Sequence, residues 1–314
     1  MSSRRGSSVI HAIGGAFGSV ISITCLFPLE TARTRLQVTK SKDKETFIRL
    51  IHSIYQNEGG FRALYRGWLS TVISLFLTNF VYFYVFNASR KIIPTTVHGD
   101  FLCGIIAGIF AVLITNPFWV INTRLKLQGV NLSSDNSQNL ESSDEPHQGK
   151  EKKGRKYRGS FHCAYCIWKE EHISVFWAGT QSSLLLVANP AIQFTCYEAI
   201  KKFTFSTPDT QINILNLSPS VVHFLNGAIS KFAATLMTYP LQVLQTRTRA
   251  GCQSEKIEGK NLIRQMIFIA KNDGIPGLFK GFNSKITQTC LNAAIMFFIY
   301  EKVLATLVYI FKLE

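Results

Sequence analysis

A proline-centred motif occurs three times in this 314-residue chain, each time where an apolar run gives way to a basic, polar one. Proline lacks a backbone N–H and kinks a helix, so each copy predicts a long helix bent near its end. Three copies in one chain indicate three copies of one structural unit. The copies read Pro28-Leu-Glu30-Thr-Ala-Arg33-Thr-Arg35, Pro117-Phe-Trp119-Val-Ile-Asn122-Thr-Arg124 and Pro240-Leu-Gln242-Val-Leu-Gln245-Thr-Arg247.

A second element follows each motif and consists of an acidic residue and then an aromatic residue, a variable residue and glycine. The copies are Glu58 to Tyr65-Arg66-Gly67, Glu171 to Trp177-Ala178-Gly179 and Asp273 to Phe279-Lys280-Gly281. The middle copy has the longer spacing because it contains residues 131–156, which are mostly polar and cannot bury enough surface to fold. We therefore predict repeats at 7–93, 98–204 and 219–308, with a disordered insert at 131–156.

Each repeat contains two apolar stretches, and most are near the length that crosses a hydrocarbon layer of about 30 Å. They are Val9–Leu29, Leu69–Ala88, Phe101–Ile121, Leu184–Ala199, Val221–Leu241 and Ile286–Val308. The prediction is an all-α membrane protein with six transmembrane helices. The fourth stretch reaches spanning length when it is extended to 179–203. A large soluble helical protein is the alternative, but the total apolar content and the short basic loops favour the membrane.

Basic residues outnumber acidic ones by 34 to 19, and most lie in the loops inside the repeats. Six crossings would place both termini on one side and these loops on the other, where they would concentrate anions. Nucleic-acid binding is disfavoured because the basic residues do not accompany an aromatic platform. The chain has no phosphate-binding glycine loop or nucleophile elbow, so we expect no enzyme activity. His162, Cys163, Cys166 and His172 lack a second fixed ligand pair, so no metal site is expected.

The repeats resemble the mitochondrial carrier family from Val9 to Val308, on the basis of the in-frame copies of both elements. The resemblance implies a bundle of six helices with pseudo-threefold symmetry around a central water-filled cavity. It also implies short amphipathic helices on the matrix side and two gates that open alternately around one substrate site. We expect a monomer in the bilayer.

In the family, acids and bases of neighbouring motifs pair to close the matrix-side gate. Carried onto this chain, the pairing places Glu30 with Asn122, Trp119 with Gln245, and Gln242 with Arg33. None is an ion pair, and two are charge-assisted hydrogen bonds at most. Gln37 matches the glutamine that braces this gate in the family, whereas Lys126 and Arg249 depart from it at the equivalent positions.

The second, cytosolic-side gate of the family carries the pattern [FY]-[DE]-x-x-[KR] on the even-numbered helices. The copy with Glu198 and Lys201 is complete, the copy with Asn87 and Arg90 lacks the acid, and the copy with Glu301 lacks the base. The family pairing leaves Glu301 with Arg90 as the one ionic link and places Lys201 opposite Asn87.

Ionisable residues inside a membrane are costly and suggest function. Lys231 and Lys285 fall within or at the edge of predicted helices and would suit an anionic or phosphorylated substrate. Lys285 has an equally plain explanation as a helix-end lysine that reaches the interface. Lys231 is too deep for this, so it is the stronger substrate-binding candidate.

The family's substrate contacts map onto further residues of the even-numbered helices, namely Ser74, Leu185, Leu186 and either Gln288 or Thr289. No arginine occupies these positions, unlike in the ADP/ATP carriers. The two leucines are suited to a flat adenine ring, and ordinary packing explains them equally well.

The stretch from Ser183 to Phe194, with Asn79 and Tyr82, is similar to the peroxisomal membrane carriers. That similarity adds Asn79, Tyr82, Asn189 and Gln193 as candidate substrate contacts. It implies exchange of CoA, FAD, NAD, AMP, ADP and ATP, with no permanently bound cofactor.

The expected location is the peroxisomal membrane, crossed several times, with both termini cytosolic. A receptor that imports peroxisomal membrane proteins is a candidate partner, and the basic stretch Lys150–Arg158 is a candidate signal. One alternative is a carrier for folate, FAD or NAD in the mitochondrial inner membrane. The other is a non-transporting protein of membrane organisation or receptor binding, which the lost gate charges motivate.

Overall fold

The computed structural model describes residues 2–39, 46–94, 96–130, 157–205, 219–251 and 261–311. The predicted insert at 131–156 lies outside these residues. All regular elements within the described ranges are helices. The chain divides into two compact units, unit 1 and unit 2, each of which is described by itself.

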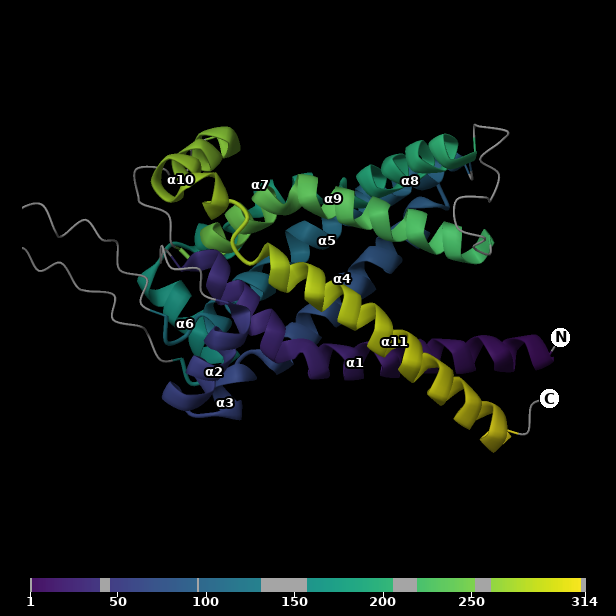
Figure 1. The fold of residues 1–314 in the computed structure, drawn as a ribbon, viewed down its shortest axis with the longest axis horizontal. Helices are drawn as coiled ribbons and strands as arrows, with labels where there is room; N and C mark the ends of the chain where they lie inside the picture. Colours follow the sequence, from purple (N-terminus) through teal and green to yellow (C-terminus); the bar gives the residue numbers. More distant parts are fainter. Residues whose placement is uncertain are drawn as a thin grey trace, which may run out of the picture. The chain divides into compact units, whose positions relative to one another are not determined.

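Unit 1 comprises Met1–Val72, Asn122–Cys163 and Gly281–Glu314. Its longest helices, α1 and α11, lie side by side, and the start of α1 and the end of α11 point to the same side (Figure 1). The short helices α2 and α3 pack together through Ile54, Ala63 and Leu64. The bounds are α1 Ser2–Val38, α2 Phe47–Asn57, α3 Phe61–Leu64 and α11 Phe282–Phe311.

Unit 2 comprises Ile73–Ile121 and Ala164–Lys280. In this unit α8 and α9 lie side by side, and α7 and α10 also contact α9 (Figure 1). Helices α4 (Trp68–Ser89), α5 (Val97–Lys126) and α6 (Ser160–Glu170) each have residues in both units. The remaining elements are the 3-10 helix η1 Ile173–Trp177, α7 Thr180–Leu186, α8 Asn189–Phe205, α9 Pro219–Arg249 and α10 Leu262–Gly277.

The three motif prolines lie inside α1, α5 and α9, and each helix continues beyond its proline. The residue before the proline contacts the second element of its own repeat. In repeat 1, Phe27 stacks on Tyr65 with ring centroids 5.8 Å apart. In repeat 3, Tyr239 stacks on Phe279 at 6.2 Å, and its hydroxyl donates to the backbone oxygen of Lys280 at 2.8 Å.

Repeat 2 makes the same contact with a polar side chain. Asn116 is fully buried, and its Nδ2 donates to the backbone oxygen of Ala178 and to Thr180 Oγ1, both at 3.0 Å. The amide thus docks onto the second element where stacked rings do so in the other repeats. The two predicted elements therefore belong to one packing unit in each repeat.

The last arginine of the motif forms an ion pair with the acidic residue of the second element in repeats 1 and 3. Arg35 makes a bidentate pair with Glu58 at 2.5 and 2.9 Å, and Arg247 lies 2.6 Å from Asp273. Both arginine side chains are buried, at 2% and 8% exposure. These pairs hold the region after the proline against the short helices that follow.

The glycines that end the three second elements share a left-handed conformation, with φ of 82° at Gly67, 76° at Gly179 and 80° at Gly281. A side chain is disfavoured at such angles, so the shared glycine has a backbone cause. Helices α4, α7 and α11 each begin at the next residue.

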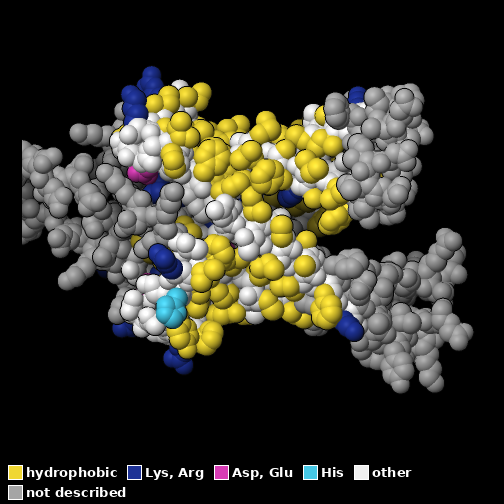
Figure 2. Space-filling model, viewed as in Figure 1, with side chains coloured by type: hydrophobic (Ala, Val, Ile, Leu, Met, Phe, Trp, Pro, Cys, Tyr) yellow, Lys and Arg dark blue, Asp and Glu magenta, His cyan; other side chains and the backbone are white. Residues whose placement is uncertain are grey.

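Two helical stretches, Phe61–Ser89 and Gly99–Lys126, have the length and apolar composition needed to cross a membrane. Hydrophobic side chains cover much of the face in Figure 2, while Lys and Arg gather mainly toward the helix ends. The six-span arrangement stays a prediction. The fourth predicted span is not one continuous helix, because the structure divides it into α7 and α8.

Proline explains that division. Pro190 is the second residue of α8, where its missing N–H is tolerated, and its ring disfavours a helix running through from the preceding turn. Val187 and Ala188 instead donate to backbone oxygens three residues earlier.

Candidate functional site

The fifth position after each motif proline is occupied by Arg33, Asn122 and Gln245. Asn122 Oδ1 accepts a hydrogen bond from Thr71 Oγ1 at 3.0 Å, and Gln245 Nε2 donates to Ser183 Oγ at 2.7 Å. Each hydroxyl residue lies one turn after the left-handed glycine of the preceding repeat. The polar replacements at this position therefore join neighbouring repeats without charge.

Glu30, the single acid at the second position after the motif prolines, forms its ion pair with Lys126. The distance from Lys126 Nζ to Glu30 Oε1 is 2.6 Å, and the side chains are 4% and 17% exposed. The structure shows no bond for the predicted Glu30–Asn122 link between these described residues, and the lysine one turn after Asn122 reaches the carboxylate instead. Arg33 and Lys285 also interact electrostatically with Glu30.

Trp119, at the second position after the proline of repeat 2, has the Arg249 guanidinium as its neighbour. The Arg249 guanidinium carbon lies 5.9 Å from the centroid of the indole ring. Arg249 Nη2 also donates to Asn116 Oδ1 at 2.8 Å and to Ser183 Oγ at 3.1 Å. Gln245, the predicted partner of Trp119, instead bonds to Ser183.

Arg33 donates from Nη1 to Gln288 Oε1 at 3.1 Å, which brings a predicted gate residue to a predicted substrate contact. Gln242 donates to Thr238 Oγ1 at 3.3 Å. Arg33 and Gln242 belong to different units, so their pairing stays a prediction. Gln37, the bracing residue, is buried on α1 at 2% exposure.

Arg90 forms an exposed bidentate ion pair with Asp100 of α5, at 2.8 and 2.9 Å. Asn87 donates to the backbone oxygen of Phe83 at 2.8 Å, and the structure shows no bond between it and Lys201, which is half-buried on α8. The Lys201–Asn87 contact therefore stays a prediction.

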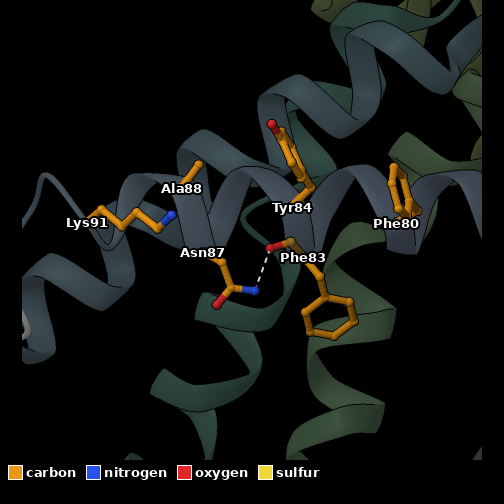
Figure 3. Close-up of a pocket in the computed structure, with 6 residues that line it drawn as sticks. All are labelled: Phe80, Phe83, Tyr84, Asn87, Ala88 and Lys91. Carbon is orange, nitrogen blue, oxygen red and sulfur yellow. Dashed lines mark hydrogen bonds between the residues drawn. The ribbon is translucent and has the colours of Figure 1, made fainter.

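Glu198 is half-buried on α8. Glu301 belongs to α11, but its side chain lies outside the described part of the chain, so the Glu301–Arg90 pairing is untested. Asn87 also lines a pocket at the end of α4 (Figure 3), with Phe80, Phe83, Tyr84, Ala88 and Lys91. Phe83 and Asn87 project to one side of the helix, and Tyr84 and Ala88 to the other (Figure 3).

Two hydrogen bonds join α8 to α9 in unit 2, and we call their four polar side chains the α8–α9 polar cluster. The exposed Lys231 donates from Nζ to Gln193 Oε1 at 3.1 Å, and Asn189 Nδ2 donates to Thr238 Oγ1 at 3.1 Å. Asn189 Oδ1 is buried with no hydrogen-bond partner. The structure thus brings together three predicted contacts, and adds Thr238, which follows Lys231 by about two helical turns.

The remaining predicted substrate contacts lie on α4 and α7, which correspond to the second and fourth predicted spans. On α4, Ser74 is buried, Asn79 is exposed, and the Tyr82 ring stacks on Phe86 at 6.1 Å. On α7, Leu185 is 52% exposed and Leu186 is half-buried. Whether these residues contact a substrate stays a prediction.

The contacts of Lys126 with Glu30 and of Arg249 with Trp119 were not predicted. The available signal was the position of the two cations, since both occupy the ninth place after the motif proline, where repeat 1 has Gln37. One helical turn separates that place from the fifth position, so a long basic side chain there can reach the same neighbour.

Comparison with known proteins agrees with the repeats. The family model described as mitochondrial carrier protein matches residues 4–97, 94–207 and 217–310. The mouse peroxisomal membrane protein PMP34 is 38% identical over 308 residues, covering 95% of this chain and 93% of the relative.

Two further relatives are named as carriers of nicotinamide adenine dinucleotide. The peroxisomal carrier of Arabidopsis thaliana is 27% identical, covering 94% of this chain and 95% of its own length. The mitochondrial transporter 1 of Saccharomyces cerevisiae is 28% identical, with 94% and 76% covered. With three matched segments that together span nearly its whole length, this chain belongs to the mitochondrial carrier family.

Proposed function

We propose that this protein exchanges adenine-containing, phosphorylated cofactors across the peroxisomal membrane by alternating access. The substrates are CoA, FAD, NAD and the adenine nucleotides. The observation that carries the proposal is the α8–α9 polar cluster, in which a lysine cation lies beside amide groups on neighbouring helices. Peroxisomal and NAD-carrying relatives support the organelle and the substrate class.

The chemistry of the cluster suits such a substrate. Lys231 is exposed, so its ammonium can bind a phosphate. Gln193, whose Oε1 accepts a hydrogen bond from that ammonium, can exchange this bond for one to the ligand. The buried Asn189 Oδ1 lacks a donor, and a base amine or a ribose hydroxyl would supply one. One site can therefore bind the charged and the neutral polar groups of a nucleotide.

Uptake into liposomes tests the proposal. Labelled CoA, FAD, NAD, AMP and ATP are offered to the reconstituted protein against each internal counter-substrate, and saturable uptake of at least one is expected. Lys231→Ala should reduce this uptake strongly, whereas Lys202→Ala, which removes an exposed lysine on α8, should leave it near the wild-type rate. Absence of saturable uptake for all five would favour a non-transporting membrane protein.

The location needs a separate measurement. A tagged protein should coincide with a peroxisomal marker in cells. Coincidence with a mitochondrial inner-membrane marker would favour the mitochondrial alternative, which the similarity to the yeast NAD transporter motivates.

A further inference from the structure

We propose that Lys126 and Arg249 supply the cations that repeats 2 and 3 lack at the fifth motif position, and that they hold the matrix-side gate closed from one helical turn further on. In repeats 2 and 3 the fifth position carries Asn122 and Gln245. The cation at the ninth position then contacts the second-position residue of the preceding repeat. This inference rests on the proposed alternating access.

The contact between repeats 1 and 2 is an ion pair. Lys126 lies 2.6 Å from Glu30, and its Nζ is also 5.1 Å from the centroid of the Phe27 ring. With both side chains largely buried, water and salt screen the pair little. In the described part of the chain, the structure shows no bond between Glu30 and Asn122, which the sequence pattern would place opposite each other, and the Asn122 Oδ1 accepts from Thr71 instead.

The contact between repeats 2 and 3 follows the same spacing with different chemistry. Trp119 replaces the acid at the second position, and Arg249 lies over its indole face. Tryptophan is the best aromatic partner for a cation, and a guanidinium stacks on it while its N–H groups donate elsewhere. Here those groups reach Asn116 and Ser183. The Glu30–Lys126 ion pair and the Trp119–Arg249 cation–π contact therefore join equivalent motif positions, the second of one repeat and the ninth of the next.

The displacement explains why this chain retains a gate despite its lost charges. A turn of helix advances about 5.4 Å, which moves the cations beyond the expected level while keeping them on nearly the same helix face. At the fifth position, Asn122 and Gln245 join neighbouring repeats through hydrogen bonds to hydroxyl groups. The ion pair and the cation–π contact are made by the residues at the ninth position.

A double-mutant cycle on thermal unfolding in detergent tests the first contact without any substrate. Glu30→Gln and Lys126→Gln should each lower the melting temperature, and the double variant should lose clearly less than the sum of the two shifts. The matched control is Lys169→Gln, which removes an exposed lysine whose Nζ lies 5.9 Å from the Tyr165 ring, and whose shift should add to that of Glu30→Gln.

The competing pairing of Glu30 with Asn122 is tested by a second double-mutant cycle, with Glu30→Gln and Asn122→Ala. Stronger coupling of Glu30 to Asn122 than to Lys126 would overturn the inference, as would additive shifts for Glu30 and Lys126. If Lys126→Gln does not fold, the exchanged pair Glu30→Lys with Lys126→Glu decides. Recovery of folded protein supports the contact, and failure like that of the single variant counts against it.

Arg249 is tested by Arg249→Gln combined with Trp119→Leu, for which a similar excess over additivity is expected. These melting shifts separate the inference from the proposed function. A wild-type protein that shows the coupling but takes up no cofactor would contradict transport alone, whereas uptake without coupling would contradict the displaced gate alone.

Discussion

The buried pair of Arg35 and Glu58 yields a quantitative prediction for Glu58→Gln. Arg35 is 2% exposed and donates to both oxygens of Glu58 and to the backbone oxygens of Lys126 and Gln128 at 3.0 and 2.9 Å. The substitution removes the one anion paired with this guanidinium among the described residues and leaves its charge among the neutral backbone oxygens of Lys126 and Gln128. Breaking a buried pair from one side costs about 3–5 kcal/mol.

The exposure of Glu58 places the expected cost at the lower end of this range, because its side chain is 23% exposed and water can replace part of its contribution. The bond of 3.2 Å that Arg66 also loses adds only a small cost, since Arg66 is half-exposed. A loss of about 3 kcal/mol in a chain of this size corresponds to a fall in Tm of about 5–10 °C. The measurement is thermal unfolding of the purified protein in detergent, followed by intrinsic fluorescence.

The control is Asp100→Asn, which breaks a bidentate pair of similar geometry whose side chains are 42% and 41% exposed. Exposed pairs contribute about 0–1 kcal/mol, so its Tm should stay close to the wild-type value. In the double variant Arg35→Met with Glu58→Gln, part of the lost stability should return, because no charge is then left buried. Equal falls in Tm for Glu58→Gln and Asp100→Asn would refute the reasoning from burial.

Two further substitutions are predicted from the backbone and the buried amide. Gly179→Ala should lower stability by about 1–2 kcal/mol, since its φ is 76° and a Cβ would lie 3.3 Å from the backbone oxygen of Gln245, whereas Gly159→Ala, with open space around it, should not. Asn116→Ala should cost about 1–3 kcal/mol because it removes a fully buried amide that bonds to four neighbouring residues. Asn57→Ala, at an exposed position of α2, should change little. Melting curves of the four variants check both predictions.

The repeat could be predicted from the sequence because its signals are local. Proline, glycine and the acidic residue each impose a backbone or charge requirement at one position, and the structure places them in equivalent surroundings. Pro28 and Pro240 lie in long helices, and the arginines at the end of both motifs pair with the following acid.

The gate partners could not be predicted in the same way. The alignment of the three motifs predicts that Asn122 faces Glu30. Side-chain length decides which group contacts the Glu30 carboxylate, and the longer Lys126 reaches it from the next turn of the helix. The division of the fourth span has a different cause. Apolar composition favours one long helix, and the backbone restriction at Pro190 prevails over it.

The glycines of the second element set how closely neighbouring repeats pack, and they do so independently of the charged residues of the motif. A Cβ on Gly67 would lie 3.3 Å from Asn122 Oδ1, and one on Gly179 would lie equally close to the Gln245 backbone oxygen, so the absence of a side chain sets how near the neighbouring repeats approach. The nearest atoms at these Cβ positions are uncharged, and the Arg249 atom near that of Gly179 is the aliphatic Cγ, at 3.4 Å. Substitutions that change only the charged or aromatic groups at the second and ninth motif positions should therefore alter how firmly the proposed gate closes more than they alter the backbone distances. This would give the scaffold a means of tuning transport rate without redesigning its packing.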